Sequence, residues 1–327
     1  MSLPSRHAAS WRWFKMRCLV TGAAGFLGSH LLSHLLQSGN TVTIILRPAT
    51  DDRRIRYLLP HVNVIAYDLA NIGEVGDRIL AAQPEIVFHL AWIGGNNSIK
   101  KQNDLSQIAD NLPGSMLLLQ KCIDAGIRRW IGIGSALEYG NRSGLLHETD
   151  TPHPRSLYGI SKYALCLAAA KLCELSDIEC LWIRPFATYG LQDNPSALIP
   201  FVIQSLLRGE RPPLTAGEQC WDYLYADDAA RAMVQLGAAP GARGVFNLAS
   251  GEAYILRGLI ERIRDLINPA LPLGFGEIAY PADQIMSLQA DVSRLKLASG
   301  WSPEVSFEEG ARRVIEEYQM RNRDVGL

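Results

Sequence analysis

The sequence predicts an α/β protein with a doubly wound parallel sheet of Rossmann type and a smaller C-terminal α/β lobe. Three observations predict it. Short apolar runs alternate with amphipathic stretches over the first 185 residues or so. The first apolar run leads directly into a glycine-rich turn and then an amphipathic stretch, as in dinucleotide-binding folds. Beyond residue 185 this rhythm breaks and prolines become frequent.

The individual elements follow from length and composition. Six runs are too short for helices and rich in β-branched residues, which predicts strands over 17–22, 41–46, 62–67, 85–91, 129–135 and 179–185. Their near-continuous apolarity suits strands that are buried on both faces of a parallel sheet. Between them, amphipathic stretches predict helices over 25–38, 73–83, 104–125 and 157–176. Such alternation implies right-handed crossovers.

Composition restricts the class of protein. Of 327 residues, 48% are hydrophobic and 20% charged, which argues against disorder. The net charge of −1 excludes a global basic field for nucleic acid. No apolar run approaches the ~18 residues of a membrane span. Six scattered cysteines without a CxxC pair indicate reduced thiols and a cytoplasmic location. We expect an extension (1–15), a dinucleotide-binding domain (16–185) and a mainly substrate-binding lobe (186–327), with some interleaving of the chain.

The glycine-rich turn predicts a dinucleotide site. Gly22 permits the tight turn, Gly25 lets the backbone approach a pyrophosphate, and Gly28 lets the helix pack closely on the strand. Amides at the helix start, including those of Phe26 and Leu27, then face the phosphates, where the helix dipole favours negative charge. A glycine triplet alone is weak evidence, but this one lies between a strand and a helix.

Residues after the second and third strands bear on the choice of cofactor. Arg47 stands about twenty residues past the glycines, where an acid would bind ribose hydroxyls and an arginine suits a 2′-phosphate. NADP(H) is therefore favoured, and NAD(H) stays open, because Arg47 is alternatively a solvated arginine at a strand end. Asp68, followed by Leu69, ends the third strand and is either a hydrogen-bond partner of the adenine amino group or a turn aspartate.

A serine, a tyrosine and a lysine form the candidate catalytic set. Ser135 ends the fifth strand, and the four-residue spacing puts Tyr158 and Lys162 on one helix face. A nearby ammonium, with an oxidised nicotinamide, is expected to lower the phenol pKa into the working range. Ser135 would stabilise charge on the reacting oxygen. A tyrosine and lysine four apart are common by chance, so this prediction depends on the preceding nucleotide loop.

No metal site is expected. His30 and His34 have a zinc-like spacing, but Leu31 stands where a metalloprotease helix needs glutamate. Trp92, just past the fourth strand, either touches substrate or belongs to the core.

Taken together, these motifs resemble the extended short-chain dehydrogenase/reductase family, over nearly the whole chain from Met16. The resemblance rests on TGAAGFLG (21–28), Asp68-Leu69, HLA (89–91), NLPG (111–114), YGISK (158–162), RPFATYG (184–190), GEQCWDYLYADDAARA (217–232), FNLASG (246–251) and GWSPEVSFEEG (300–310).

The resemblance implies roles by position. Ser135, Tyr158 and Lys162 would be the catalytic triad, with Lys162 also holding the nicotinamide ribose. Asn111 would support a water or the catalytic lysine. Leu90, Ala91, Trp92 and Pro185 would line the cofactor, and the substrate would contact Trp92, Ser135, Ala136, Tyr158, Ala187, Leu198 and Trp221. Family members act mostly on nucleotide-diphosphate sugars and commonly form homodimers through the helices over 104–125 and 157–176. Packing within one chain is the alternative for those helices.

Departures from the family pattern restrict the reactions and substrates that we expect. Ala136 and Leu137 replace the acidic pair of sugar dehydratases, which argues against water elimination. Ala187 and Trp221 replace an asparagine and an arginine that commonly contact the diphosphate, so Arg155, Arg184 or Arg294 would have to compensate.

The stretches 198–228 and 284–291 are similar to CDP-abequose and CDP-paratose synthases, which are 4-ketoreductases. The expected function is therefore NADPH-dependent reduction of a nucleotide-linked 4-keto-6-deoxyhexose at C4. The alternatives are an NAD-dependent UDP-hexose 4-epimerase and a catalytically inactive cofactor-sensing or scaffold protein.

Overall fold

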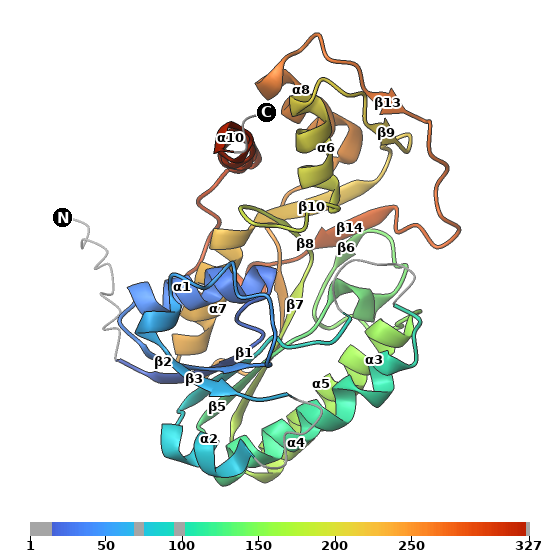
Figure 1. Ribbon diagram of the computed structural model, residues 1–327. Coiled ribbons are helices and arrows are strands. Elements are labelled where there is room, and N and C mark those ends of the chain that lie inside the picture. The colour runs from blue at the N-terminus through green and yellow to red at the C-terminus, as the bar shows by residue number, and fades with distance from the viewer. Residues whose placement is uncertain (1–14, 69–74, 95–101, 325–327) are drawn as a thin grey trace, which may run out of the picture.

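A computed structural model describes residues 15–68, 75–94 and 102–324. Its centre is a seven-stranded sheet whose strands pair in parallel in the order β11-β7-β5-β4-β1-β2-β3 (Figure 1). The strands are β1 (Arg17–Thr21), β2 (Thr41–Leu46), β3 (Asn63–Ala66), β4 (Ile86–His89), β5 (Arg129–Ile133), β7 (Glu179–Pro185) and β11 (Gly244–Leu248). The strand order reverses next to β1, which confirms the doubly wound Rossmann-type sheet.

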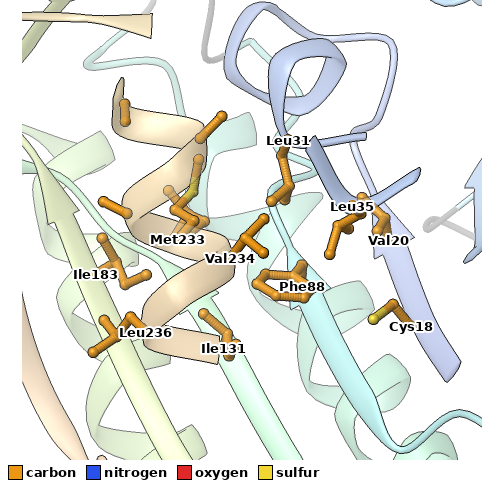
Figure 2. Packing of buried hydrophobic residues seen from close by; sticks show 14 of the residues in the cluster. Cys18, Val20, Leu31, Leu35, Phe88, Ile131, Ile183, Met233, Val234 and Leu236 are labelled. Atoms are coloured by element: carbon orange, nitrogen blue, oxygen red, sulfur yellow. The ribbon is translucent and has the colours of Figure 1, made fainter. Parts of the chain in front are cut away.

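Helices cover both faces of this sheet. One face carries α1 (Phe26–Gln37), α7 (Ala226–Ala238) and α9 (Ser293–Ser299), and the other carries α2 (Gly76–Ala82), α4 (Asn111–Asp124) and α5 (Leu157–Leu175). Neighbouring strand residues point in opposite directions, so Val20 packs toward α1 and α7 while Leu19 packs toward α4. Figure 2 shows Phe88, Ile131 and Ile183 of the sheet beneath α7.

The helix expected over 104–125 is divided into α3 (Ser106–Ala109) and α4 (Asn111–Asp124). Pro113 explains the division. Proline has no amide hydrogen to donate to the carbonyl of Ala109, and its ring clashes with that carbonyl in a continuous helix. The chain therefore restarts at Asn111, with Pro113 in the first turn of α4, where its missing donor costs little.

The smaller lobe has a second sheet in the order β12-β10-β14-β6, with β8 also pairing with β10. Its elements are β6 (Leu145–Leu146), β8 (Ala187–Tyr189), β10 (Cys220–Tyr225), β12 (Ala253–Ile255), β14 (Ser287–Ala290), the short pair β9 (Pro213–Leu214) and β13 (Gly274–Phe275), and helices α6 (Leu198–Leu207), α8 (Leu256–Ile267) and α10 (Phe307–Asp324). These three helices share a hydrophobic core and lie beyond one end of the large sheet (Figure 1).

The chain crosses between the two sheets in both directions. β6, from the first half, joins the small sheet, while β11, from the second half, forms an edge of the large one. The predicted boundary at residue 185 falls at the end of β7 and stays a prediction. Within the part of the chain that the structure describes, no helix is long and apolar enough to cross a membrane.

Candidate active site

The glycine turn between β1 and α1 is closely packed against the end of β4. Gly22 has φ +74°, and a Cβ there would lie 2.6 Å from the amide nitrogen of Ala91. A Cβ on Gly28 would lie 2.0 Å from the Gly22 carbonyl oxygen. Gly25 precedes α1 and brings no side chain to cap its first amides. Those amides are therefore available to a phosphate, and the backbone forms the tight cradle that a dinucleotide requires.

A buried histidine fixes the loop that follows β4. His89 is hydrogen-bonded to Thr21 Oγ1 (2.8 Å) through Nδ1 and to Ser115 Oγ (2.9 Å) through Nε2. Burial, and then the charge of Lys162, lower its pKa to about 3, so the ring is neutral. Thr21 Oγ1 also accepts from the Ala91 amide at 3.2 Å. This network holds Leu90, Ala91 and Trp92 beside the glycine turn.

Ser135, Tyr158 and Lys162 come together at the carboxyl end of β5. Ser156 caps α5 by accepting from the Gly159 amide (3.1 Å), which places Tyr158 in the first turn and Lys162 one turn further. Lys162 Nζ donates to the Ile133 carbonyl at 2.8 Å and lies 5.9 Å from the centre of the Tyr158 ring. The Ser135 side chain lies close enough to the Tyr158 phenol to lower its pKa.

The protonation of this set differs from the expectation. Burial raises the pKa of Tyr158 to about 12, although the Ser135 side chain opposes this, and burial lowers the pKa of Lys162 to about 7. The predicted lowering of the phenol pKa by Lys162 is therefore wrong for the protein chain by itself. The reason is that loss of hydration disfavours the charged form of both groups.

Trp92 belongs to this site. Its ring centre lies 3.9 Å from Lys162 Nζ, and its ring meets that of Tyr158 edge to face at 6.1 Å. Its indole nitrogen donates to Gln107 Oε1 at 2.7 Å. Asn111 accepts from the Ile93 amide (2.6 Å) and donates to the Ile93 carbonyl (3.1 Å). Asn111 therefore anchors the loop that carries Trp92, and its support of a water or of Lys162 stays a prediction.

The other expected cofactor residues lie around the same sheet edge. Arg47 is exposed directly after β2, and Asp68 is half-buried just beyond β3. Pro185 ends β7. Leu69 lies outside the described residues. Arg54 also reaches this region: its Nε donates to the Gln192 carbonyl at 2.8 Å, and its guanidinium reaches the Ala24 carbonyl at 3.5 Å, beside the glycine turn.

The expected substrate residues divide into two groups. Ala136, Ala187 and Trp221 share one apolar cluster at the junction of the sheets, where Trp221 Nε1 donates to the Ile285 carbonyl at 2.9 Å. Leu198 instead begins α6 and packs on the core of the small lobe. The structure thus brings the first group toward Ser135 and places Leu198 with a different core.

Arg184 does not replace the missing diphosphate contacts. Its side chain is only 2% exposed, and its Nε donates to Glu138 Oε2 at 2.8 Å. Sequence reasoning missed Glu138, although the Ser135-to-Glu138 spacing is that of a capping box. Arg294 is also engaged, because it donates to the Arg243 carbonyl at 2.7 Å and covers the Phe246 ring.

The described residues contain no cluster of histidine, cysteine and acidic side chains that could hold a metal ion. His30 and His34 both face Asp227, with His30 Nδ1 2.8 Å and His34 Nε2 3.5 Å from Asp227 Oδ1. Because Asp227 lies in the first turn of α7, this contact joins α1 to α7.

The sheet, the glycine cradle and the serine–tyrosine–lysine set define a nucleotide-dependent oxidoreductase. The chain belongs to the NAD dependent epimerase/dehydratase family, whose model matches residues 18–249. It is an NAD(P)-dependent enzyme of the short-chain dehydrogenase/reductase type.

Two curated relatives match almost end to end. The UDP-glucose 4-epimerase of Mycolicibacterium smegmatis is 27% identical, over 94% of this chain and 100% of its own. The CDP-abequose synthase of Salmonella muenchen is 24% identical, over 91% of this chain and 97% of its own. Among solved structures, the Bordetella bronchiseptica enzyme WbmG, in complex with NAD and UDP, is similar with a TM-score of 0.79 and 26% identity, over 95% of this chain and 96% of that one.

Proposed function

We propose that this enzyme uses NADPH to reduce a nucleotide-linked 4-keto-6-deoxyhexose at C4. The observation that carries the proposal is the convergence of Ser135, Tyr158 and Lys162, together with an exposed arginine, Arg47, at the end of β2. The similarity to CDP-abequose synthase supports a nucleotide sugar as substrate.

The reaction needs a proton donor, and Tyr158 fits that task. A phenol whose pKa is raised to about 12 is fully protonated at neutral pH. The bound cofactor supplies the hydride. Tyr158 then gives its proton to the developing C4 alkoxide while the Ser135 hydroxyl holds that oxygen. Lys162, one turn away, orients the site and stabilises the phenolate that remains.

The protonation of Tyr158 bears on the choice between reduction and epimerisation. A 4-epimerase begins by oxidising the sugar, which requires Tyr158 to accept a proton as a phenolate. Among the described residues, the Ser135 side chain lowers the pKa of Tyr158 but burial outweighs it, so the phenolate would need the positive charge of an oxidised nicotinamide beside it. Similarity to the M. smegmatis UDP-glucose 4-epimerase keeps epimerisation as the second candidate.

Elimination of water is not supported. Dehydration needs an acid and a base beside the serine, and Ala136 and Leu137 cannot supply them. The nearest acid along the chain, Glu138, is fully buried and accepts from the Ser135 amide, the Trp182 indole and Arg184. Its oxygens are committed to the protein and cannot exchange protons with a substrate.

Arg47 supports NADPH as the electron donor. Its guanidinium is exposed at the position that faces the adenosine ribose in this fold, and two parallel hydrogen bonds to a phosphate suit arginine. Arg54 lies nearby, beside the glycine turn, and adds positive charge. NADH remains the second candidate cofactor, since the WbmG structure contains NAD.

A homodimer is part of the proposal. Exposed apolar side chains lie on α4 and α5, with Leu117 41% exposed, Leu167 54% and Leu175 71%. A second copy that packs its own α4 and α5 here would remove them from water. Light scattering on the purified protein tests this, and a monomeric mass at micromolar concentration would contradict it.

The decisive experiment is to mix the protein with NADPH and a nucleotide-linked 4-keto-6-deoxyhexose and follow NADPH absorbance. We expect stoichiometric consumption, faster with NADPH than with NADH. Purification with tightly held NAD, together with interconversion of UDP-glucose and UDP-galactose and no net cofactor consumption, would overturn the reductase in favour of the epimerase. Activity in neither assay would support the inactive scaffold.

A further inference from the structure

Glu138 is a buried charge that the proposed mechanism leaves unused. It belongs to a short 3₁₀ helix (η4, Ala136–Tyr139) directly after Ser135, and its side chain is 0% exposed. A carboxylate that is fully removed from water is costly unless several donors surround it. Three donors do: the Ser135 amide (2.9 Å), Trp182 Nε1 (2.9 Å) and Arg184 Nε (2.8 Å).

The carboxylate and Ser135 hold each other in a reciprocal arrangement. Glu138 accepts from the backbone amide of Ser135, while the Ser135 hydroxyl accepts from the Leu137 amide at 3.1 Å. The same serine side chain lies close enough to Tyr158 to lower the pKa of its phenol. The position of Ser135 relative to Tyr158 therefore depends on the Glu138 carboxylate, which accepts from the backbone amide of the serine.

The surrounding residues leave room for this carboxylate. A Cβ on Gly134 would lie 2.2 Å from Glu138 Oε1 and 2.2 Å from Trp182 Nε1, so only glycine fits there. Arg184 approaches from β7 and places its guanidinium 4.4 Å from the Tyr139 ring centre. Its Nη1 atom is buried and has no hydrogen-bond partner among the described residues.

We propose that Glu138 is a positioning residue for the reaction: it fixes Ser135 against Tyr158 and keeps a negative charge beside the tyrosine–lysine pair. The proposal rests on the proposed catalytic roles of Ser135, Tyr158 and Lys162. It does not depend on which sugar is reduced.

The electrostatic part of the proposal has a definite sign. The carboxylate of Glu138 raises the pKa of Lys162, where it opposes the effect of burial. It also raises the pKa of Tyr158, where burial acts in the same direction. Both effects hold protons on the pair. The other titratable or charged groups facing it, within the described residues, are His89 on β4, Cys166 on α5, Tyr139 in η4 and Arg184 on β7. Burial keeps His89, Cys166 and Tyr139 neutral, and Glu138 is the charged side chain that shifts the pKa values of both Tyr158 and Lys162.

The test is the substitution Glu138→Gln, with Glu179→Gln as the matched control. Glu179 is the carboxylate of a second buried arginine–glutamate pair, with Arg129, at the opposite end of β7. Selective ¹³C labelling of lysine side chains allows the Lys162 signal to be titrated by NMR, assigned with Lys162→Met. We expect Glu138→Gln to lower the pH at which Lys162 titrates by about one unit, a tenfold change in its protonation equilibrium, and Glu179→Gln to leave it unchanged.

This titration needs no substrate, so it separates the inference from the proposed reaction. Where reductase activity is present, the alkaline limb of the pH profile for kcat/KM should move to lower pH in Glu138→Gln, because both pKa values fall. If Glu138→Gln does not fold, the double variant Glu138→Gln/Arg184→Met removes both charges, leaves none unpaired, and should still shift Lys162 downward. An unchanged Lys162 titration in a folded variant overturns the proposal, even if the reductase assay succeeds.

Discussion

The two ends of the large sheet each hold a buried arginine–glutamate pair that includes a residue of β7, and the two pairs do different work. At the amino end, Arg129 Nε donates to Glu179 Oε2 at 2.8 Å, and its other nitrogens donate to backbone carbonyls at the end of α7, including that of Ala239 at 2.9 Å. At the carboxyl end, Arg184 and Glu138 stand behind Ser135. The same type of ion pair caps the end of α7 at the amino end of the sheet and supports the candidate catalytic serine at the carboxyl end.

A sizeable empty space lies at the end of the sheet that lacks the candidate catalytic residues. A cavity of about 780 Å³ is lined by residues of the amino end, including Arg129 and Glu179, and its described lining contains none of Ser135, Tyr158 or Lys162. In a doubly wound sheet, ligands bind beyond the carboxyl ends of the strands. The position of the glycine turn and of the reactive groups therefore locates the active site better than cavity size does.

Removing the hydroxyl of Tyr158, the proposed proton donor, should have the largest effect on activity at the carboxyl end of the sheet. Tyr158→Phe deletes one hydroxyl and leaves the ring against Trp92. Because general acid catalysis contributes about 10²–10⁴-fold, we expect kcat for NADPH consumption to fall by that factor. Affinity for NADPH, measured by fluorescence titration, should change little. Turnover at the wild-type rate would show that Tyr158 is not the donor.

At the amino end, the expected loss is in stability alone. Glu179→Ala leaves Arg129 buried without its carboxylate, which should lower the free energy of unfolding by about 3 kcal/mol. Urea unfolding measures this change. Activity per folded molecule should be retained, since the pair lies at the far end of β7. A fall in kcat at full occupancy of the folded state would contradict the separation of the two ends.

The glycine cradle offers a local test at the carboxyl end. A Cβ in Gly28→Ala would meet the Gly22 carbonyl oxygen at 2.0 Å, so α1 must shift away from β1. We expect a cost of about 1–3 kcal/mol in unfolding free energy and weaker NADPH binding. Gly258→Ala is the control, because that helical glycine has open space around it and alanine favours helices. Equal NADPH affinity in Gly28→Ala and wild type would argue against the cradle.

Local sequence signals predicted one part of this molecule well and another poorly. The strands, the glycine turn and the spacing of Tyr158 and Lys162 depend on residues close together in the chain, and the structure has the predicted sheet. The pairing of Glu138 with Arg184 depends on β5 and β7 lying side by side, and the Ser135-to-Glu138 spacing could at most have indicated the contact of Glu138 with Ser135. The raised pKa of Tyr158 depends on burial, which no motif encodes.

A smaller change is expected on removal of Arg47, the arginine that we propose contacts the 2′-phosphate of NADPH. Arg47→Ala removes an exposed charge after β2, so we expect the Kd for NADPH to rise about tenfold, or about 1.4 kcal/mol, while the Kd for NADH stays the same. Calorimetric titration of both nucleotides measures the difference. Equal losses for NADPH and NADH would mean that Arg47 does not contact a 2′-phosphate.

The last prediction concerns the free energy that burying Lys162 costs the fold. The pKa of Lys162 is about 7 in the folded protein and 10.5 as its ordinary value, so the unfolded chain binds more protons between those values and stability rises with pH across that window. Below about pH 7 the cost of burying the charge is complete. Lys162→Met abolishes this cost, while it leaves the Ile133 carbonyl unpaired at every pH. The difference in Tm between Lys162→Met and wild type should therefore favour the variant more near pH 6 than near pH 9. A difference independent of pH would show that Lys162 keeps an ordinary pKa in the folded protein, and that burial at the catalytic end of the sheet does not act on this amine.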